Sequence, residues 1–225
     1  GKAYVGLLKV NALHAKNENP GGTQYVSRHQ IEAAVRGISS DFFFTRHSCR
    51  QFSDDPITKD QIEIAARVAQ KSPVVCNRQS GRIHTFTSSA DITKILELQG
   101  GARGFSHGVT TLFCITVDMR NFHGVGERYQ GWIDGGLFAM SFILGLHMQK
   151  IGTCCLNWSK ESEADDLMHE LLTLPDNESI IMFVAAGQLN EEMVVARSRR
   201  KELQEVLTFD YLDSSATNFG ERTNP

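Results

Sequence analysis

Two uninterrupted apolar segments constrain the fold of this chain more than any other feature. Residues 111–117 read TLFCITV and residues 179–186 read SIIMFVAA, so both segments are apolar at nearly every position. Successive side chains of a strand point to opposite faces of its sheet, so a strand with this pattern is buried on both sides. The two segments therefore predict a sheet that is covered by helices on both faces.

Helix signals lie before and between these two segments. Thr58 and Gln61 have the spacing of a capping box, and the helix that they begin should end by Pro73. Residues 91–98 should form a second helix that is closed by Gly100. A further strand is expected over residues 82–87, and residues 27–35 have a helix-like pattern.

Two more helices are expected in the second half of the chain. Residues 133–148 are apolar all round, which predicts a helix at the centre of the fold or in a subunit interface. Ser159 should cap an acidic amphipathic helix whose inward face is formed by Ala164, Leu167, Met168, Leu171 and Leu172. We thus predict an N-terminal extension over residues 1–41, one α+β domain over residues 42–212 and a polar tail over residues 213–225.

The composition excludes several functional classes. The chain has 225 residues, with 23 Lys and Arg against 26 Asp and Glu, a balance that argues against general nucleic-acid binding. Its five cysteines lack metal-ligand spacing, so we predict free thiols, no metal site and a cytoplasmic protein. No segment reads as a membrane span or a secretory signal, and we expect no association with membranes.

Three polar clusters stand out as candidate functional residues. Arg46, Ser48 and Arg50 alternate, so on an extended segment their side chains share one face and can bind an anion. Residues 197–201 read RSRRK, and residues 72–79 end in amide side chains that suit the edge of a heterocycle. Each cluster taken alone also fits a plainer interpretation, namely a solvated basic face or a simple turn.

Together the three clusters resemble the FMN-dependent nitroreductase family. That family carries the motif R-[RH]-S-x-[RK]-x-F, then S-P-S-x-x-N-x-Q-P-W, then a basic cluster near the C-terminus. Here the first motif reads R-H-S-C-R-Q-F over residues 46–52, and the second reads S-P-V-V-C-N-R-Q-S-G over residues 72–81. The resemblance implies a mostly antiparallel central sheet between helices, in an interlocked homodimer with FMN at the interface.

The resemblance also assigns residues to the FMN. Arg46, His47, Ser48 and Arg50 would hold the ribityl phosphate and the pyrimidine edge, and Arg103 would lie at that same edge. A nearby arginine stabilises the negative charge of reduced flavin, and the phosphate carries about −1.5 to −2 charges near pH 7. Several arginines therefore suit this cofactor.

Three other segments would complete the site. Arg200 matches the family's phosphate-binding arginine, with Arg197 as a helper and Arg199 as an alternative. The other subunit would line the isoalloxazine with Pro73, Val74, Val75 and Asn77. A backbone N–H would face flavin N5 from the segment formed by Cys155, Leu156 and Asn157.

The chain departs from the family pattern in ways that concern the substrate more than the fold or the FMN. Ser80 and Gly81 replace the usual Pro-Trp pair, which removes an aromatic side chain from the start of a strand. Val74 replaces a serine that often bonds the flavin, and Asn157 replaces an acidic residue that is common in one subgroup. About forty residues precede the first motif, where many members have far fewer.

The expected function is that of an FMN-dependent oxidoreductase. It would pass hydride from NAD(P)H to a small-molecule acceptor such as a nitroaromatic or a quinone, in a ping-pong cycle. No catalytic side chain is expected because the flavin carries the chemistry. Two alternatives stay open: a specialised biosynthetic flavin dehydrogenase with poor nitroreductase activity, and a flavin-binding protein without turnover.

Overall fold

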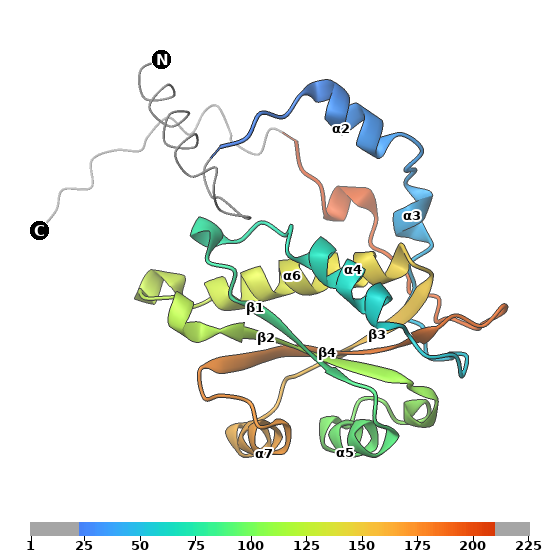
Figure 1. Cartoon of the computed structure of the whole chain (residues 1–225), viewed down its shortest axis with the longest axis vertical. Coiled ribbons are helices and arrows are strands. Elements are labelled where there is room, and N and C mark those ends of the chain that lie inside the picture. Colours follow the sequence, from blue (N-terminus) through green and yellow to red (C-terminus); the bar gives the residue numbers. More distant parts are fainter. Residues whose placement is uncertain (1–22, 210–225) are drawn as a thin grey trace, which may run out of the picture. The chain divides into compact units, whose positions relative to one another are not determined.

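Four antiparallel strands form the central sheet of this computed structural model, which describes residues 23–209 (Figure 1). They are β1 (Gly81–Phe86), β2 (Thr111–Asp118), β3 (Ile151–Asn157) and β4 (Glu178–Gln188). The order across the sheet is β1-β2-β4-β3, and every neighbouring pair is antiparallel. The two apolar segments are thus the inner strands β2 and β4, and the predicted α+β class is confirmed.

Helices cover both faces of this sheet. Helices α4 (Lys59–Ala69) and α6 (Gln130–His147) lie on one face, and α5 (Ser89–Gln99) and α7 (Ser162–Leu172) lie on the other (Figure 1). Every residue of β2 is buried, and its neighbouring side chains alternate between two hydrophobic cores. Phe113 packs with α6, with its ring 4.9 Å from that of Phe142, whereas Leu112 belongs to the core on the other face.

The predicted start of α4 and the predicted end of α5 are confirmed. Thr58 caps α4, and Gln61 completes the capping box: the Gln61 N–H donates to Thr58 Oγ1 at 3.3 Å. Helix α5 ends at Gly100, whose φ of +78° is the left-handed conformation that glycine adopts without strain. Local capping chemistry therefore fixed both of these boundaries.

Helix α7 differs from the prediction at its start and on its inward face. Its N-cap is Glu161 rather than Ser159. Met168 is buried as expected, but Leu167 and Leu171 are 50% and 42% exposed. The inward side of this helix is a narrow stripe four residues apart, which contains the half-buried or buried Ala164, Met168 and Leu172.

His169 ties α7 to the sheet. Its Nε2 lies 2.7 Å from the carbonyl oxygen of Glu178 in β4, and its Nδ1 lies 2.9 Å from that of Asp165. Burial alone lowers the pKa of His169, but these two carbonyl acceptors favour the protonated ring and raise the pKa above its usual value.

Strand β3 was not predicted from the sequence. The segment IGTCCLN is rich in small side chains and has neither a continuous apolar run nor an alternating pattern, so it gives no strand signal of its own. It becomes a strand because β4 pairs with it over the whole length, from Ile151 opposite Gln188 to Asn157 opposite Met182.

The described residues before His47 form a separate unit. It contains α2 (Arg28–Val35) and the short α3 (Asp41–Phe44). Ser27 caps α2 in a capping box with Gln30, which confirms the helix expected there. Residues 1–22 of the predicted extension and the predicted tail over residues 213–225 lie outside the described residues.

Short 3-10 turns complete the fold between the larger elements: η1 (Val75–Asn77), η2 (Ser106–Gly108), η3 (Met119–Asn121), η4 (Val125–Glu127) and η5 (Leu203–Glu205). Over residues 23–209, none of the helices combines the length and the apolar character that crossing a bilayer requires.

Helices α4 and α6 approach so closely that only glycine fits at their contact. A Cβ at Gly145 would lie 2.8 Å from the Cα and 3.1 Å from the carbonyl oxygen of Ala65. We expect Gly145→Ala to lower the free energy of unfolding by about 1–3 kcal/mol, because backbone must move to admit the methyl group. Urea unfolding followed by circular dichroism measures this change.

Gly136→Ala is the matched control in the same helix, because a Cβ there meets nothing of the chain within 4 Å. We expect it to be neutral or stabilising by up to about 1 kcal/mol, since alanine favours the helix. Equal effects of the two substitutions would contradict the proposed helix contact.

Candidate functional site

The first motif lies along the outer edge of β3. Ser48 forms a parallel bridge with Thr153, and the N–H of Cys49 donates to the carbonyl oxygen of Thr153 at 2.9 Å. Because this pairing is parallel, the chain from Ser48 to Arg50 runs toward Cys155 and the end of β3. Of the extended arrangement expected for Arg46, Ser48 and Arg50, the structure shows the pairing of residues 48–49 with β3. The N–H of Arg46 instead donates to the carbonyl oxygen of Phe43 at 3.4 Å.

Two glycines allow the motif to pack on the sheet. A Cβ at Gly187 would lie 2.6 Å from the Cβ of Phe52, and one at Gly152 would lie 3.1 Å from the Cβ of Cys49. The buried Cys49 and the half-buried Phe52 thus occupy space that glycine leaves free in β3 and β4. This packing fixes the backbone that carries Ser48 and Arg50.

The loop that follows α5 meets the same end of β3. The guanidinium carbon of Arg50 lies 5.9 Å from the ring centroid of Phe105, within the range of a cation–π interaction. Phe105 is buried, whereas Arg50 and Arg103 are exposed. The structure therefore brings the predicted Ser48, Arg50 and the loop of Arg103 to the predicted segment at the end of β3.

Gln99 holds this loop in place and was missed in the sequence. Its Nε2 donates to the carbonyl oxygen of Asn157 at 2.9 Å, and its Oε1 accepts the N–H of Gly101 at 2.6 Å. Gln99 is 4% exposed, so both of its amide groups are satisfied inside the protein. A polar residue at the end of an amphipathic helix gave no distinct signal in the sequence.

The second motif forms a strained loop at the start of β1. Cys76, Asn77 and Gln79 all have positive φ, between 48° and 54°. This left-handed conformation is uncommon outside glycine, and asparagine tolerates it best. Three such residues in four positions need firm anchors on the rest of the chain.

Asp134 of α6 supplies the first anchor. Its carboxylate accepts the N–H of Val75 at 3.1 Å and the side-chain amide of Gln130 at 2.8 Å. Asp134 is only 2% exposed, so these bonds replace the water that a buried carboxylate loses. In the sequence, the signal for this role is that Asp134 is the one acidic residue in the apolar stretch 133–148.

Arg78 supplies the second anchor. Its guanidinium donates to the carbonyl oxygen of Asn121 at 2.8 Å and pairs with Glu127 at 2.9 Å. The hydrogen bond from Arg78, with a further one from the N–H of His123, lowers the pKa of Glu127 to about 2. The loop is thus joined to the segment that leads into α6.

Phe138 of α6 occupies the space beside the altered end of the second motif. A Cβ at Gly81 would lie 2.7 Å from Cγ of Phe138, so a larger side chain there requires the ring to move. The neighbouring Ser80 is fully buried, and its hydroxyl finds no hydrogen-bond partner among residues 23–209. At the position of the usual Pro-Trp pair, the chain therefore has a buried serine and a glycine that lies against the ring of Phe138.

The two halves of the predicted site lie at opposite edges of the sheet. Ser48, Arg50 and the segment 155–157 belong to the β3 edge, whereas the loop with Pro73, Val74, Val75 and Asn77 precedes β1. With β2 and β4 between them, the edge strands are separated by three spacings of about 4.8 Å. A single chain does not bring the two halves together.

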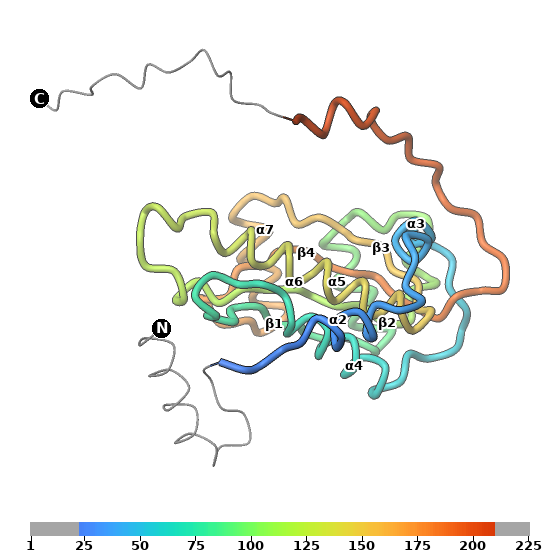
Figure 2. The backbone as a smooth tube through the Cα atoms, turned by 90° about the horizontal axis from the view of Figure 1, so that it is seen from above, coloured from blue at the N-terminus to red at the C-terminus, as the bar shows by residue number. Residues whose placement is uncertain are grey.

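The remaining predicted arginines are not joined to either half. Arg197, Arg199 and Arg200 are exposed on the extended segment that leaves the sheet after β4 (Figure 2). The start of this segment is held by Gln51, whose Oε1 accepts the N–H of Val194 at 2.9 Å. Arg46 ends the separate N-terminal unit, and the exposed His47 begins the unit that contains the sheet.

Comparisons with known proteins identify the family and the fold. The family model described as Nitroreductase family matches residues 44–102 and 96–188, which together span well over half of the chain. No curated protein matches the sequence.

Solved structures of similar fold include three with informative names. An FMN-dependent nitroreductase from Clostridium difficile R20291 has a TM-score of 0.64 at 16% identity, over 76% of this chain and 98% of its own. A nitroreductase family protein from Clostridium difficile 630 has a TM-score of 0.63 at 18% identity, over 78% of this chain and 99% of its own. The NADPH:FMN oxidoreductase from Vibrio harveyi has a TM-score of 0.66 at 16% identity, over 77% of each chain.

The anchoring role of Asp134 predicts a local effect of its removal. We expect Asp134→Ala to speed amide hydrogen exchange in residues 73–80 about tenfold or more, because a hydrogen bond to a charged group is lost. Exchange measured by mass spectrometry resolves this segment from the inner strand β2, which should keep its protection.

Asp134→Asn is the matched variant, since it retains one oxygen that can accept the N–H of Val75. Its effect should be smaller than that of alanine. Unchanged exchange over residues 73–80 in the alanine variant would show that the loop is held by other contacts.

Proposed function

Because this chain belongs to the nitroreductase family, we propose that it is an FMN-dependent oxidoreductase that uses NAD(P)H to reduce a small oxidised acceptor. Nitroaromatics and quinones are the acceptor classes that we propose. The observation that carries this proposal is the convergence of Ser48, Arg50 and the Arg103 loop on the end of β3.

The residues at this edge fit the chemistry of FMN. Arg50 and Arg103 are exposed cations on a fixed backbone, and a guanidinium offers forked donors that match phosphate and carbonyl oxygens. Ser48 adds a hydroxyl on the same segment, and the exposed Cys155 and Asn157 lie at the end of the paired strand. When bound, FMN would supply the transfer of hydride from a reduced nicotinamide to the acceptor.

The protein's own residues would bind and orient the cofactor. Arg50 would place positive charge at the pyrimidine edge, where reduced flavin is anionic, with Arg46, His47 and Ser48 toward the phosphate. A backbone N–H of the segment 155–157 would face flavin N5. Arg200, with Arg197 or Arg199, would add charge to the phosphate.

We further propose that the working form is a homodimer. Helix α6 leaves a row of large apolar side chains exposed, and Ile133, Leu137 and Met140 are 53%, 42% and 43% exposed. The loop of the second motif is tied to this same helix through Asp134. A symmetric contact through α6 would bury the row and carry Pro73, Val74, Val75 and Asn77 to the β3 edge of the partner subunit.

We also propose a cellular location and a domain organisation for the chain. All five cysteines are free, which suits a reducing compartment and supports a cytoplasmic location. We propose that residues 1–41 are an extension to a flavin-binding domain over residues 42–212, followed by a polar tail.

The departures in the second motif favour one further candidate function. Val74, Ser80 and Gly81 alter the loop that would cover the isoalloxazine, while the cations of the β3 edge are kept. This combination suits a specialised biosynthetic flavin enzyme that acts poorly on generic nitroaromatics. Stoichiometric FMN that NADH and NADPH both fail to reduce would instead favour a flavin-binding protein without turnover.

The absorbance spectrum of the purified protein tests the proposed cofactor. We expect a flavin band that bleaches when NADH or NADPH is added without oxygen. Arg50→Ala should weaken FMN binding about tenfold or more, because a charge-assisted hydrogen bond is lost. Lys94→Ala removes an exposed cation from α5 and should leave binding unchanged; protein that takes up no FMN would contradict the proposal.

Mixing two impaired variants, at an FMN concentration that leaves Arg50→Ala largely without flavin, tests the shared site. Arg50→Ala impairs one half of the site, and Val75→Glu places a bulky charge in the other half. In a mixed dimer one site carries both changes and the other carries neither, so random mixing should restore about a quarter of wild-type sites. Activity that stays at the level of the separate variants would show that each site is built from a single chain.

A further inference from the structure

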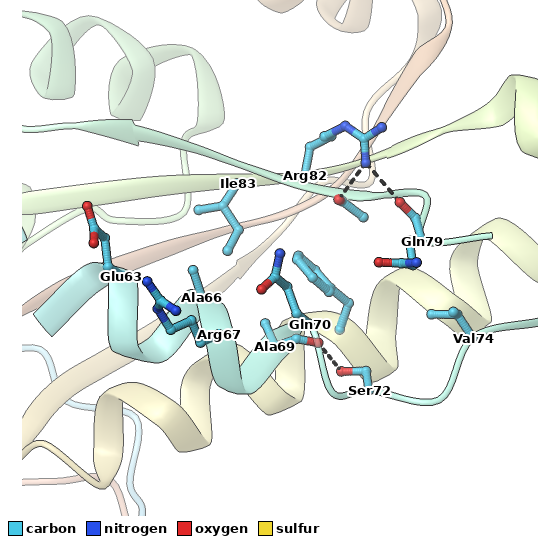
Figure 3. Close-up of a pocket in the computed structure, with 12 residues that line it drawn as sticks. Glu63, Ala66, Arg67, Ala69, Gln70, Ser72, Val74, Gln79, Arg82 and Ile83 are labelled. Atoms are coloured by element: carbon cyan, nitrogen blue, oxygen red, sulfur yellow. Dashed lines mark hydrogen bonds between the residues drawn. The ribbon is translucent and has the colours of Figure 1, made fainter. Parts of the chain in front are cut away.

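A cavity of about 610 Å³ opens between α4 and the edge strand β1 (Figure 3). Its walls come from one side of α4, the start of β1, the loop before β1 and Phe138 of α6. This volume is in the range of small-molecule sites in proteins. The cavity lies at the β1 edge of the sheet, and the proposed flavin-binding cations lie at the opposite edge, beside β3.

Small side chains create this space. Ala66 and Ala69 face the cavity from α4, where larger apolar residues would close the gap to Ile83 of β1. Gly81 and Phe138 lie in contact at one end, so the ring of Phe138 forms part of the apolar floor. The cavity therefore has an apolar interior that includes one aromatic surface.

The rim carries a cation that the protein does not neutralise. Among residues 23–209, Arg67 has no hydrogen bond or ion pair, and it is exposed at the cavity. Glu63, one turn earlier on α4, pairs instead with Lys59 at 3.5 Å. The guanidinium of Arg82 is turned toward the carbonyl oxygens of Gln79 and Gly81, each at 2.9 Å.

Two amide side chains border the aromatic floor. Gln70 stands on α4 one turn beyond Arg67, and Gln79 faces it from the loop before β1 (Figure 3). Gln70 forms no side-chain hydrogen bond within the described part of the chain, and Gln79 forms one weak bond of 3.5 Å to its own loop. Both amides are thus available as donors and acceptors.

We propose that this cavity binds a small aromatic carboxylate. The carboxylate would pair with Arg67 at the rim, and the ring would lie on Phe138 and the alanines of α4. Gln70 and Gln79 would bond polar ring substituents. This binding requires neither flavin nor the residues of the β3 edge. It goes beyond the proposed function, although Val74 of the proposed flavin-covering loop also lines the cavity.

Titration of the full-length protein with 4-fluorobenzoate, followed by ¹⁹F NMR, tests the proposal. We expect saturable binding that Arg67→Ala weakens about tenfold, because a charge-assisted contact is lost. Ala66→Phe should abolish binding by filling the cavity from an already half-buried position. Lys71→Ala, which removes an exposed cation just outside the cavity, should have no effect.

Two further measurements separate this site from the flavin site. Fluorobenzyl alcohol has the same ring without the charge, and it should bind at least tenfold more weakly. The flavin content of Arg67→Ala and Ala66→Phe should equal that of the wild type, so a failure of flavin binding is scored separately. Absence of saturable binding, or equal binding by the wild type and Ala66→Phe, would overturn the proposed carboxylate site.

Discussion

Burial of the inner strands on both faces is the constraint on which the rest of this structure depends. Every residue of β2 is buried, and its central apolar side chains alternate between two cores, so the sheet is stable only with helices packed on both sides. Helices α4 and α6 meet this need on one face through a contact so close that position 145 must be glycine. Because the centre of the molecule is committed to apolar packing, the polar residues of the candidate site lie on the edge strands and their loops.

Both edges depend on a buried polar side chain that carries no chemistry of its own. Gln99 joins the loop after α5 to the end of β3, and Asp134 joins the loop before β1 to α6. Each is almost fully buried and has its hydrogen bonds satisfied by main-chain or side-chain partners. Such groups hold exposed loops in one conformation, and at the β1 edge they offset the strain of three left-handed residues.

The sequence predicted the parts of the fold that are set by local chemistry. The inner strands, the capping box at Thr58 and the glycine that ends α5 were all correct, because their signals lie within a few residues. Strand β3 was missed because β4 and the segment at Ser48 define it, and both are distant in sequence. The predicted inward face of α7 included Leu167 and Leu171, which are exposed. Hydrophobicity alone does not reveal how much of a helix its neighbours cover. The motifs identified candidate residues of the site. The anchoring roles of Gln99 and Asp134 depend on hydrogen bonds to residues distant in sequence, so only the folded structure reveals them.

The division of the candidate site between two edges gives the departures from the family pattern a physical meaning. The cations of the first motif sit on a backbone fixed by Cys49, Phe52 and two glycines, so changes at the other edge leave them undisturbed. The second motif instead rests on α6, where Phe138 lies against Gly81 and a cavity opens beside them. Under the proposed function, these edges would meet across a dimer, with cofactor binding assigned to one and the covering loop to the other. A change in the loop of one subunit would then alter which molecules can approach the flavin of its partner, while the charges proposed to hold that flavin would stay in place.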